Sequence, residues 1–157
     1  MPFVWIGSVL ACMLPLCAAA GTPEGFFQAH RGGMNEVPEN TLAAFEHAWA
    51  IPGAVPEVDV TQTQDGVLVC LHDNTPRRTT DAPEPWADTP IGDIPYDEVR
   101  RWDAGIKFDP KYSGERVPRL DELLDRMRGR PGRQLYLDIK KVDIEAVAAA
   151  VGKRGLE

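Results

Sequence analysis

Short polar motifs follow the hydrophobic runs of this chain, and this order constrains the fold more than any other feature. Segments with helical spacing of apolar residues separate most of the runs. Strands that alternate with helices indicate a parallel sheet and an α/β fold. In such folds catalytic groups come from the C-terminal ends of the strands. The motifs are His30-Arg31-Gly32, Glu57-Val58-Asp59, His72-Asp73 and Asp138-Ile139-Lys140.

Strands and helices are predicted along most of the chain. The predicted strands cover residues 26–29, 55–62, 67–71 and 134–139. The turn signal Gln64-Asp65-Gly66 precedes the third of these strands. Asn40 and Asp143 are predicted to cap helices and Pro118 to open another, because apolar residues recur at helical spacing after each of them.

Residues 74–117 differ in composition from the rest of the chain. They contain six prolines and several aromatic residues. The segment is too long for a simple connection and too aromatic for a disordered one. We expect an inserted excursion after the third strand, with a short helix near Tyr96–Trp102.

Composition and the N-terminus narrow the class of protein. The net charge of −7 disfavours a nucleic-acid binder, which needs basic surface to neutralise phosphates. Residues 1–20 are apolar, carry no charged side chain and end in Ala18-Ala19-Ala20, which predicts a cleaved signal peptide and a secreted or periplasmic protein. A lipid anchor at Cys17 is the less favoured alternative, because Leu16 stands where a small residue is preferred. Cleavage leaves Cys70 as the sole cysteine, so a disulfide framework is excluded.

Three acidic residues form a candidate metal site. Glu57 and Asp59 are two positions apart on a strand and therefore point to the same face. Asp138 lies in an apolar run, where an uncompensated carboxylate is costly. These oxygen ligands suit Ca²⁺ or Mg²⁺. The alternative for the first two is the exposed face of an edge strand.

Two histidines and two cations complete the candidate site. His30 and His72 both follow apolar strands and suit a general acid and base, although a single histidine there is more often structural. Arg31 can stabilise phosphoryl oxygens through a bidentate fork. Lys140 shares a face with Asp138 and offers either an ion pair or a phosphate contact. Asp73 can orient His72 or cap a turn.

The motifs together resemble the glycerophosphodiester phosphodiesterase family over about residues 26–141. This resemblance implies a phosphatidylinositol-phospholipase-C-like TIM-type barrel that hydrolyses glycerophosphodiesters to glycerol phosphate and an alcohol. It implies that His30 and His72 are the acid/base pair, and that Arg31 and Lys140 contact phosphate. The family's metal ligands correspond to Glu57, Asp59 and Asp138. The matching motifs are His30-Arg31-Gly32, Pro38-Glu39-Asn40-Thr41, Glu57-x-Asp59, Thr63-x-Asp65-Gly66, His72-Asp73, Arg78-Thr79-Thr80, Asp103-Ala104-Gly105, Gly114-Glu115-x-x-Pro118-x-Leu120 and Asp138-Ile139-Lys140.

Two departures from the family qualify the expected activity. Asp138 stands where the family usually has Glu, and it is one methylene shorter. A closed (βα)8 barrel takes about 250 residues, so we expect residues 21–157 to form the N-terminal half of one, with 74–117 as its inserted subdomain. Either the chain belongs to a longer protein, which is the favoured explanation, or a second copy completes the barrel.

The sequence leaves substrate and activity partly open. The expected partner is a small-molecule glycerophosphodiester or lysolipid. Proximity to a membrane surface and the oligomeric state are both left open. One alternative is a phosphodiesterase of the lysophospholipase-D type. Another is an inactive product that binds phosphate-containing head groups.

Overall fold

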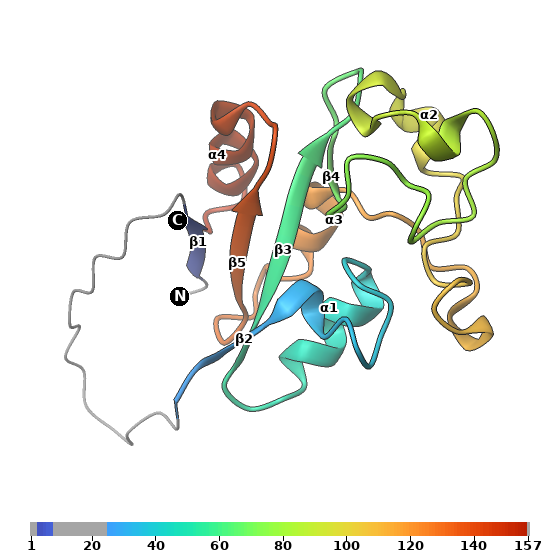
Figure 1. Ribbon diagram of the computed structural model, residues 1–157. Helices are drawn as coiled ribbons and strands as arrows, with labels where there is room; N and C mark the ends of the chain where they lie inside the picture. The colour runs from blue at the N-terminus through green and yellow to red at the C-terminus, as the bar shows by residue number, and fades with distance from the viewer. Residues whose placement is uncertain (1–2, 8–24, 157) are drawn as a thin grey trace, which may run out of the picture.

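A parallel sheet forms the centre of the molecule. The structure is a computed structural model that describes residues 3–7 and 25–156. The parallel strands lie in the order β1, β5, β3, β2, and β4 pairs with β3 in the antiparallel direction (Figure 1). The strands are β1 (Phe3–Gly7), β2 (Phe27–Ala29), β3 (Ala54–Gln62), β4 (Leu68–Cys70) and β5 (Gln134–Ile139).

Three of the four described helices cover one face of this sheet, and the acidic residues of β3 lie on the other face. The helices are α1 (Leu42–Trp49), α2 (Tyr96–Val99), α3 (Leu120–Asp125) and α4 (Ile144–Gly152). Val58 and Val60 of β3 pack with Leu135 and Leu137 of β5 against α1, α3 and α4. Because side chains alternate along a strand, Glu57 and the other odd-numbered residues of β3 point to the opposite face. Burial of the apolar set therefore fixes the face on which the acids lie.

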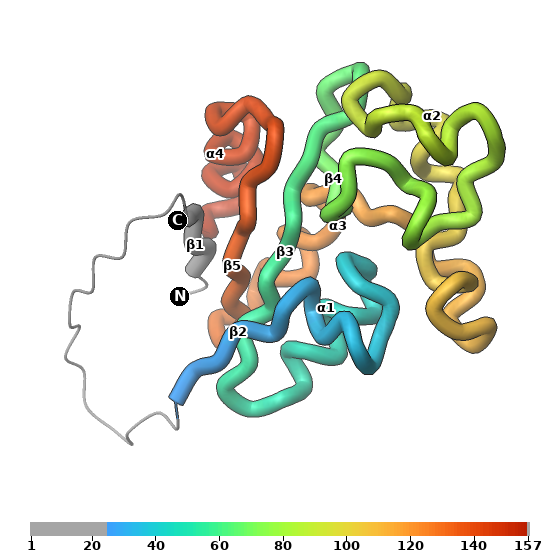
Figure 2. The backbone as a smooth tube through the Cα atoms, viewed as in Figure 1, coloured from blue at the N-terminus to red at the C-terminus, as the bar shows by residue number. Residues whose placement is uncertain are grey.

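The excursion after β4 has a core of its own. It contains α2 and the 3₁₀ turns Trp86–Asp88, Ile91–Asp93 and Pro110–Tyr112. Ile91, Ile94, Val99 and Trp102 are buried there together with Val69 of the β4 strand. Figure 2 traces this segment on the side of β3 and β4 that faces away from β5 and α4. The excursion is thus an ordered unit attached beside the sheet.

The structure confirms the α/β fold and corrects two local predictions. β4 is antiparallel to β3 because only residues 63–67 separate them, too few for the crossover that a parallel strand needs. Asn40 was expected to cap α1, but the Thr41 hydroxyl accepts the backbone N–H of Ala44 at 3.2 Å. Asp143 caps α4 as predicted, by accepting from Glu145 N–H.

The predicted signal peptide lies largely outside the described residues. Of residues 1–20, the structure describes the backbone of Phe3–Gly7, which pairs with β5 in parallel register from Phe3↔Gln134 to Gly7↔Asp138. Within the described part of the chain, no helix is long and apolar enough to cross a membrane.

Gly32 is required where the turn after β2 meets α1. Its φ is 78°, and an added Cβ would lie 2.8 Å from Ala44 Cβ and 2.9 Å from the Ala44 carbonyl carbon. We expect Gly32→Ala to lower the free energy of unfolding by about 2–4 kcal/mol, through left-handed strain and overpacking. Urea denaturation measures this change. Gly132→Ala is the matched control, because a Cβ at Gly132 meets nothing within 4 Å. Equal stabilities of the two variants would contradict the packing account.

Candidate active site and metal centre

Three carboxylates meet on the face of the sheet that the helices leave open. Glu57 and Asp59 come from β3 and Asp138 from β5, where Asp59 and Asp138 are register partners. One oxygen from each of the three lies within 4.8 Å of the other two. Glu57 and Asp59 are buried, with 4% and 0% of their surface exposed. The three acids predicted as metal ligands are therefore brought together.

Two predicted phosphate-binding cations lie against these acids. Lys140 Nζ is 2.5 Å from Asp138 Oδ2 and 3.0 Å from Asp59 Oδ1. Arg31 Nε is 3.6 Å from Asp59 Oδ2, and the Arg31 backbone N–H donates to Glu57 Oε2 at 2.7 Å. Partial burial lowers the pKa of Lys140, but its bonds to Asp138 and Asp59 outweigh this and raise the pKa overall. Lys140 therefore stays charged and competes for the same carboxylates as a metal ion.

The donor set fits a hard divalent cation. Burial raises the pKa of Glu57; the Arg31 N–H opposes this, and the charges of Asp59 and Asp138 add to it. Asp59 Oδ1 is buried and lies 3.0 Å from the Lys140 ammonium. A buried carboxylate with an unused lone pair beside two further acids is a natural oxygen ligand for Ca²⁺ or Mg²⁺. The residues that would hold the ion are Glu57, Asp59 and Asp138.

Asn40 orients Asp59. Its side-chain amide donates to Asp59 Oδ2 at 2.8 Å and accepts the Asp59 backbone N–H at 3.1 Å. Asn40 is buried and has a φ of 56°, a left-handed conformation that Asn tolerates better than most residues. Sequence reasoning missed this role because an Asn before a helix is also a common cap.

The two predicted catalytic histidines occupy different surroundings. His30 is exposed at the start of the 3₁₀ turn His30–Gly32, near enough to Glu57 for its charge to lower the pKa of that acid. His72 is half-buried after β4, and its Nδ1 lies 2.7 Å from Asp73 Oδ1. The structure thus ties His72 to Asp73, which the sequence left as one of two possibilities.

A chain of ion pairs joins Arg31, which lies beside the three acids, to Asp73, which contacts His72. Arg78 Nε and Nη2 donate to the two oxygens of Asp73 at 2.6 and 2.9 Å. Arg78 Nη1 and Nη2 donate to the two oxygens of Glu39 at 2.7 and 2.8 Å. Glu39 Oε1 also accepts from Arg31 Nη1 at 3.0 Å. Glu39 and Arg78 both lie in motifs that match the family, but their positions in the sequence alone indicated no role for either residue.

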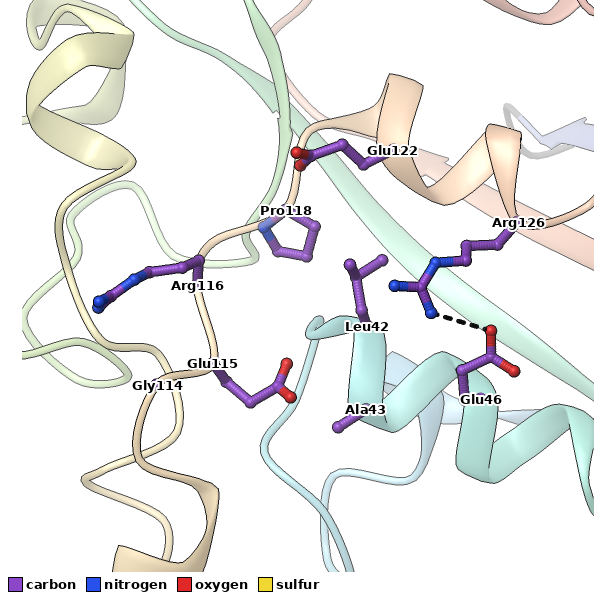
Figure 3. Close-up of a pocket in the computed structure, with 9 residues that line it drawn as sticks. All are labelled: Leu42, Ala43, Glu46, Gly114, Glu115, Arg116, Pro118, Glu122 and Arg126. Atoms are coloured by element: carbon purple, nitrogen blue, oxygen red, sulfur yellow. Dashed lines mark hydrogen bonds and ion pairs between the residues drawn. The ribbon is translucent and has the colours of Figure 1, made fainter.

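Of two cavities in this part of the molecule, one adjoins the candidate site and the other does not. One of about 400 Å³ lies between α1, residues 114–118 and α3, where Arg126, just after α3, donates to Glu46 of α1 at 3.2 Å (Figure 3). No acid or histidine of the candidate site lines it. A second cavity, of about 130 Å³, is lined by Glu39 and Arg78 and by apolar side chains that include Met34 and Phe108. The second cavity therefore adjoins the candidate site.

Removal of the Asn40 amide tests how far the site depends on it. We expect Asn40→Ala to lower the free energy of unfolding by about 2–4 kcal/mol in metal-free buffer, because it leaves the buried Asp59 carboxylate and N–H short of partners. Urea denaturation with a chelator present measures the loss. Asn35→Ala, at an exposed position in the same loop, serves as the control and should change little. An Asn40→Ala variant as stable as Asn35→Ala would contradict the orienting role.

Comparisons with known proteins agree with this geometry. The chain is 43% identical over 97 residues to the glycerophosphodiester phosphodiesterase of Caldanaerobacter subterraneus subsp. tengcongensis, which covers 62% of this chain and 38% of that protein. A crystal structure of glycerophosphodiester phosphodiesterase from Agrobacterium tumefaciens superposes with a TM-score of 0.76 at 36% identity, over 84% of this chain and 54% of that one. An Oleispira antarctica phosphodiesterase in complex with the product sn-glycerol-3-phosphate has a TM-score of 0.73 at 30% identity, over 84% and 53%.

The chain therefore spans about half the length of these relatives, or less. The prediction of a partial TIM-type barrel is confirmed by these superpositions. The family model for the glycerophosphoryl diester phosphodiesterases matches residues 30–151, a range that contains seven site residues predicted from the sequence: His30, Arg31, Glu57, Asp59, His72, Asp138 and Lys140. The chain belongs to the glycerophosphoryl diester phosphodiesterase family.

Proposed function

We propose that this protein hydrolyses glycerophosphodiesters to glycerol phosphate and an alcohol in a metal-dependent reaction. The observation that carries the proposal is the convergence of Glu57, Asp59 and Asp138 within 4.8 Å, with Arg31 and Lys140 beside them. Family membership supports the reaction class, and a solved relative holds the product sn-glycerol-3-phosphate. The acidic protein thereby concentrates positive charge at one place, as a phosphodiester substrate requires.

Each group has a separate task in the proposed reaction. Bound Ca²⁺ or Mg²⁺ supplies Lewis-acid stabilisation of the phosphoryl oxygens. Arg31 and Lys140 bind the same oxygens and hold the phosphodiester in place. One histidine of the pair His30 and His72 removes a proton from the attacking water as the new P–O bond forms. The other gives a proton to the alcohol oxygen as the old P–O bond breaks.

The two histidines give the proposal a direct test. We expect the purified protein with Ca²⁺ or Mg²⁺ to convert glycerophosphocholine into glycerol phosphate and choline. ³¹P NMR measures the appearance of glycerol phosphate. Removal of a general acid or base typically costs about 10²–10⁴-fold, so His30→Ala and His72→Ala should each lower kcat by at least about 10²-fold. His47→Ala is the control, because His47 lies on α1 and bonds Glu36.

The same assay separates the alternatives. Turnover that survives exhaustive chelation or His30→Ala would contradict the proposed chemistry. Absence of turnover by the metal-loaded protein, with head-group binding retained, would favour the inactive binder. Release of choline and lysophosphatidic acid from lysophosphatidylcholine, without hydrolysis of glycerophosphocholine, would favour the lysophospholipase-D alternative.

We also propose that residues 1–20 direct export, so that the mature protein is secreted or periplasmic. Their uncharged apolar composition and the Ala18-Ala19-Ala20 end support this proposal. Expression in a bacterial host followed by N-terminal sequencing of the exported protein should give a first residue of Gly21. A protein that retains Met1 and stays in the cytoplasm would contradict it.

A further inference from the structure

Arg77 and Arg78 are adjacent at the start of the excursion, but their acidic partners lie in different parts of the fold. Arg77 pairs with Glu84 and Asp88, both within the excursion and both about two-thirds exposed. Arg78 instead pairs with Glu39, from the loop before α1, and with Asp73, which follows β4. Arg78 therefore joins two segments that are far apart in the sequence, whereas Arg77 joins only its own neighbourhood.

Each partner of Arg78 holds one group of the proposed reaction. Glu39 Oε1 accepts from Arg31 Nη1 at 3.0 Å, and its side chain is 9% exposed. Asp73 Oδ1 lies 2.7 Å from His72 Nδ1. The path Arg31–Glu39–Arg78–Asp73–His72 thus connects the phosphate contact to one member of the acid/base pair through contacts of 2.6 to 3.0 Å.

We propose that Arg78 is a positioning residue that fixes Arg31 and His72 relative to each other. The inference rests on the proposed function, since it assigns Arg78 a task only if Arg31 and His72 act on one substrate. Arg78 touches neither the acids of the metal site nor the histidines in the contacts described above. It acts through Glu39 and Asp73, and the excursion thereby contributes directly to the geometry of the site.

The shape of the guanidinium explains why this position holds arginine. Four N–H···O contacts of 2.6 to 2.9 Å engage both oxygens of both carboxylates. A planar fork with five donors can bridge two carboxylates in fixed directions, whereas a lysine ammonium offers a point charge with three donors. Lysine at this position would keep the charge and lose the fixed directions.

The bridge also fixes the carboxylate that faces Nδ1 of His72, because Arg78 Nε and Nη2 donate to both oxygens of Asp73. The hydrogen bond from Arg78 lowers the pKa of Asp73 to about 2, against the opposing effect of burial, and His72 contributes further. An ionised Asp73 can only accept, so neutral His72 donates from Nδ1 at the 2.7 Å contact. Nε2 of the imidazole is then unprotonated and able to take a proton from a reactant.

The test compares three variants of the protein: Arg78→Gln, Arg78→Lys and the matched control Arg77→Gln. Arg78 is about half exposed, so the fold should survive, and a ¹H–¹⁵N correlation spectrum checks that it does. We expect both Arg78 variants to lower kcat at least tenfold, and Arg77→Gln to stay within twofold of the unsubstituted protein. Full activity of Arg78→Lys would contradict the proposal, because charge alone would then suffice.

A second measurement does not depend on turnover. The ¹⁵N shifts of the His72 imidazole, at a pH where it is neutral, should report protonated Nδ1 in the unsubstituted protein and in Arg77→Gln. In Arg78→Gln and Arg78→Lys, we expect a mixture with the Nε2-protonated tautomer. Unchanged ¹⁵N shifts in both Arg78 variants would overturn the proposal. If the protein shows no hydrolysis at all, the proposed function fails, while the shifts still decide whether Arg78 positions His72.

Discussion

The buried carboxylate of Asp59 is the constraint on which the rest of the site depends. It lies on the central strand β3 with no exposed surface, where an ionised group without partners would cost several kcal/mol. Three neighbours offset this cost. Asn40 donates a hydrogen bond to one oxygen, and the positive charges of Lys140 and Arg31 lie close to the carboxylate. Both Asn40 and Arg31 adopt left-handed backbone conformations to reach it. Strained residues of this kind persist where surrounding structure determines them, and here they surround a candidate metal centre.

The division of the sheet into two faces allows this polar site to coexist with a stable core. Val58 and Val60 face the helices, and the alternation of the strand turns Glu57 and Asp59 the other way. The excursion packs around its own apolar cluster beside β4. Ion pairs through Arg78 link it to the loop that carries Arg31. Stability is thus supplied on the helix side of the sheet, while the opposite face and the excursion supply charge and orientation.

Much of the fold and the acidic cluster could be predicted, because local patterns determine them. Hydrophobic runs predicted β3 and β5, the spacing of Glu57 and Asp59 predicted their shared face, and Asp143 was recognisable as a cap. Long-range pairing had no such signal. Arg78 and Glu39 are 39 positions apart, and nothing in either segment alone indicates that they meet. Asn40 was assigned to the wrong task, since a capping Asn and a left-handed Asn look alike in sequence. The direction of β4 followed from turn length, which outweighed the expectation of parallel strands.

The central claim is that Glu57, Asp59 and Asp138 together bind the divalent ion that the proposed reaction uses. Crystals of the protein soaked in Mn²⁺, an anomalous scatterer that accepts the oxygen ligands of Mg²⁺, locate the ion directly. The account predicts one strong anomalous peak within about 2.0–2.6 Å of oxygens from all three carboxylates, the range of such bonds. A peak elsewhere on the molecule, with Lys140 still bonded to Asp59 and Asp138, would contradict it.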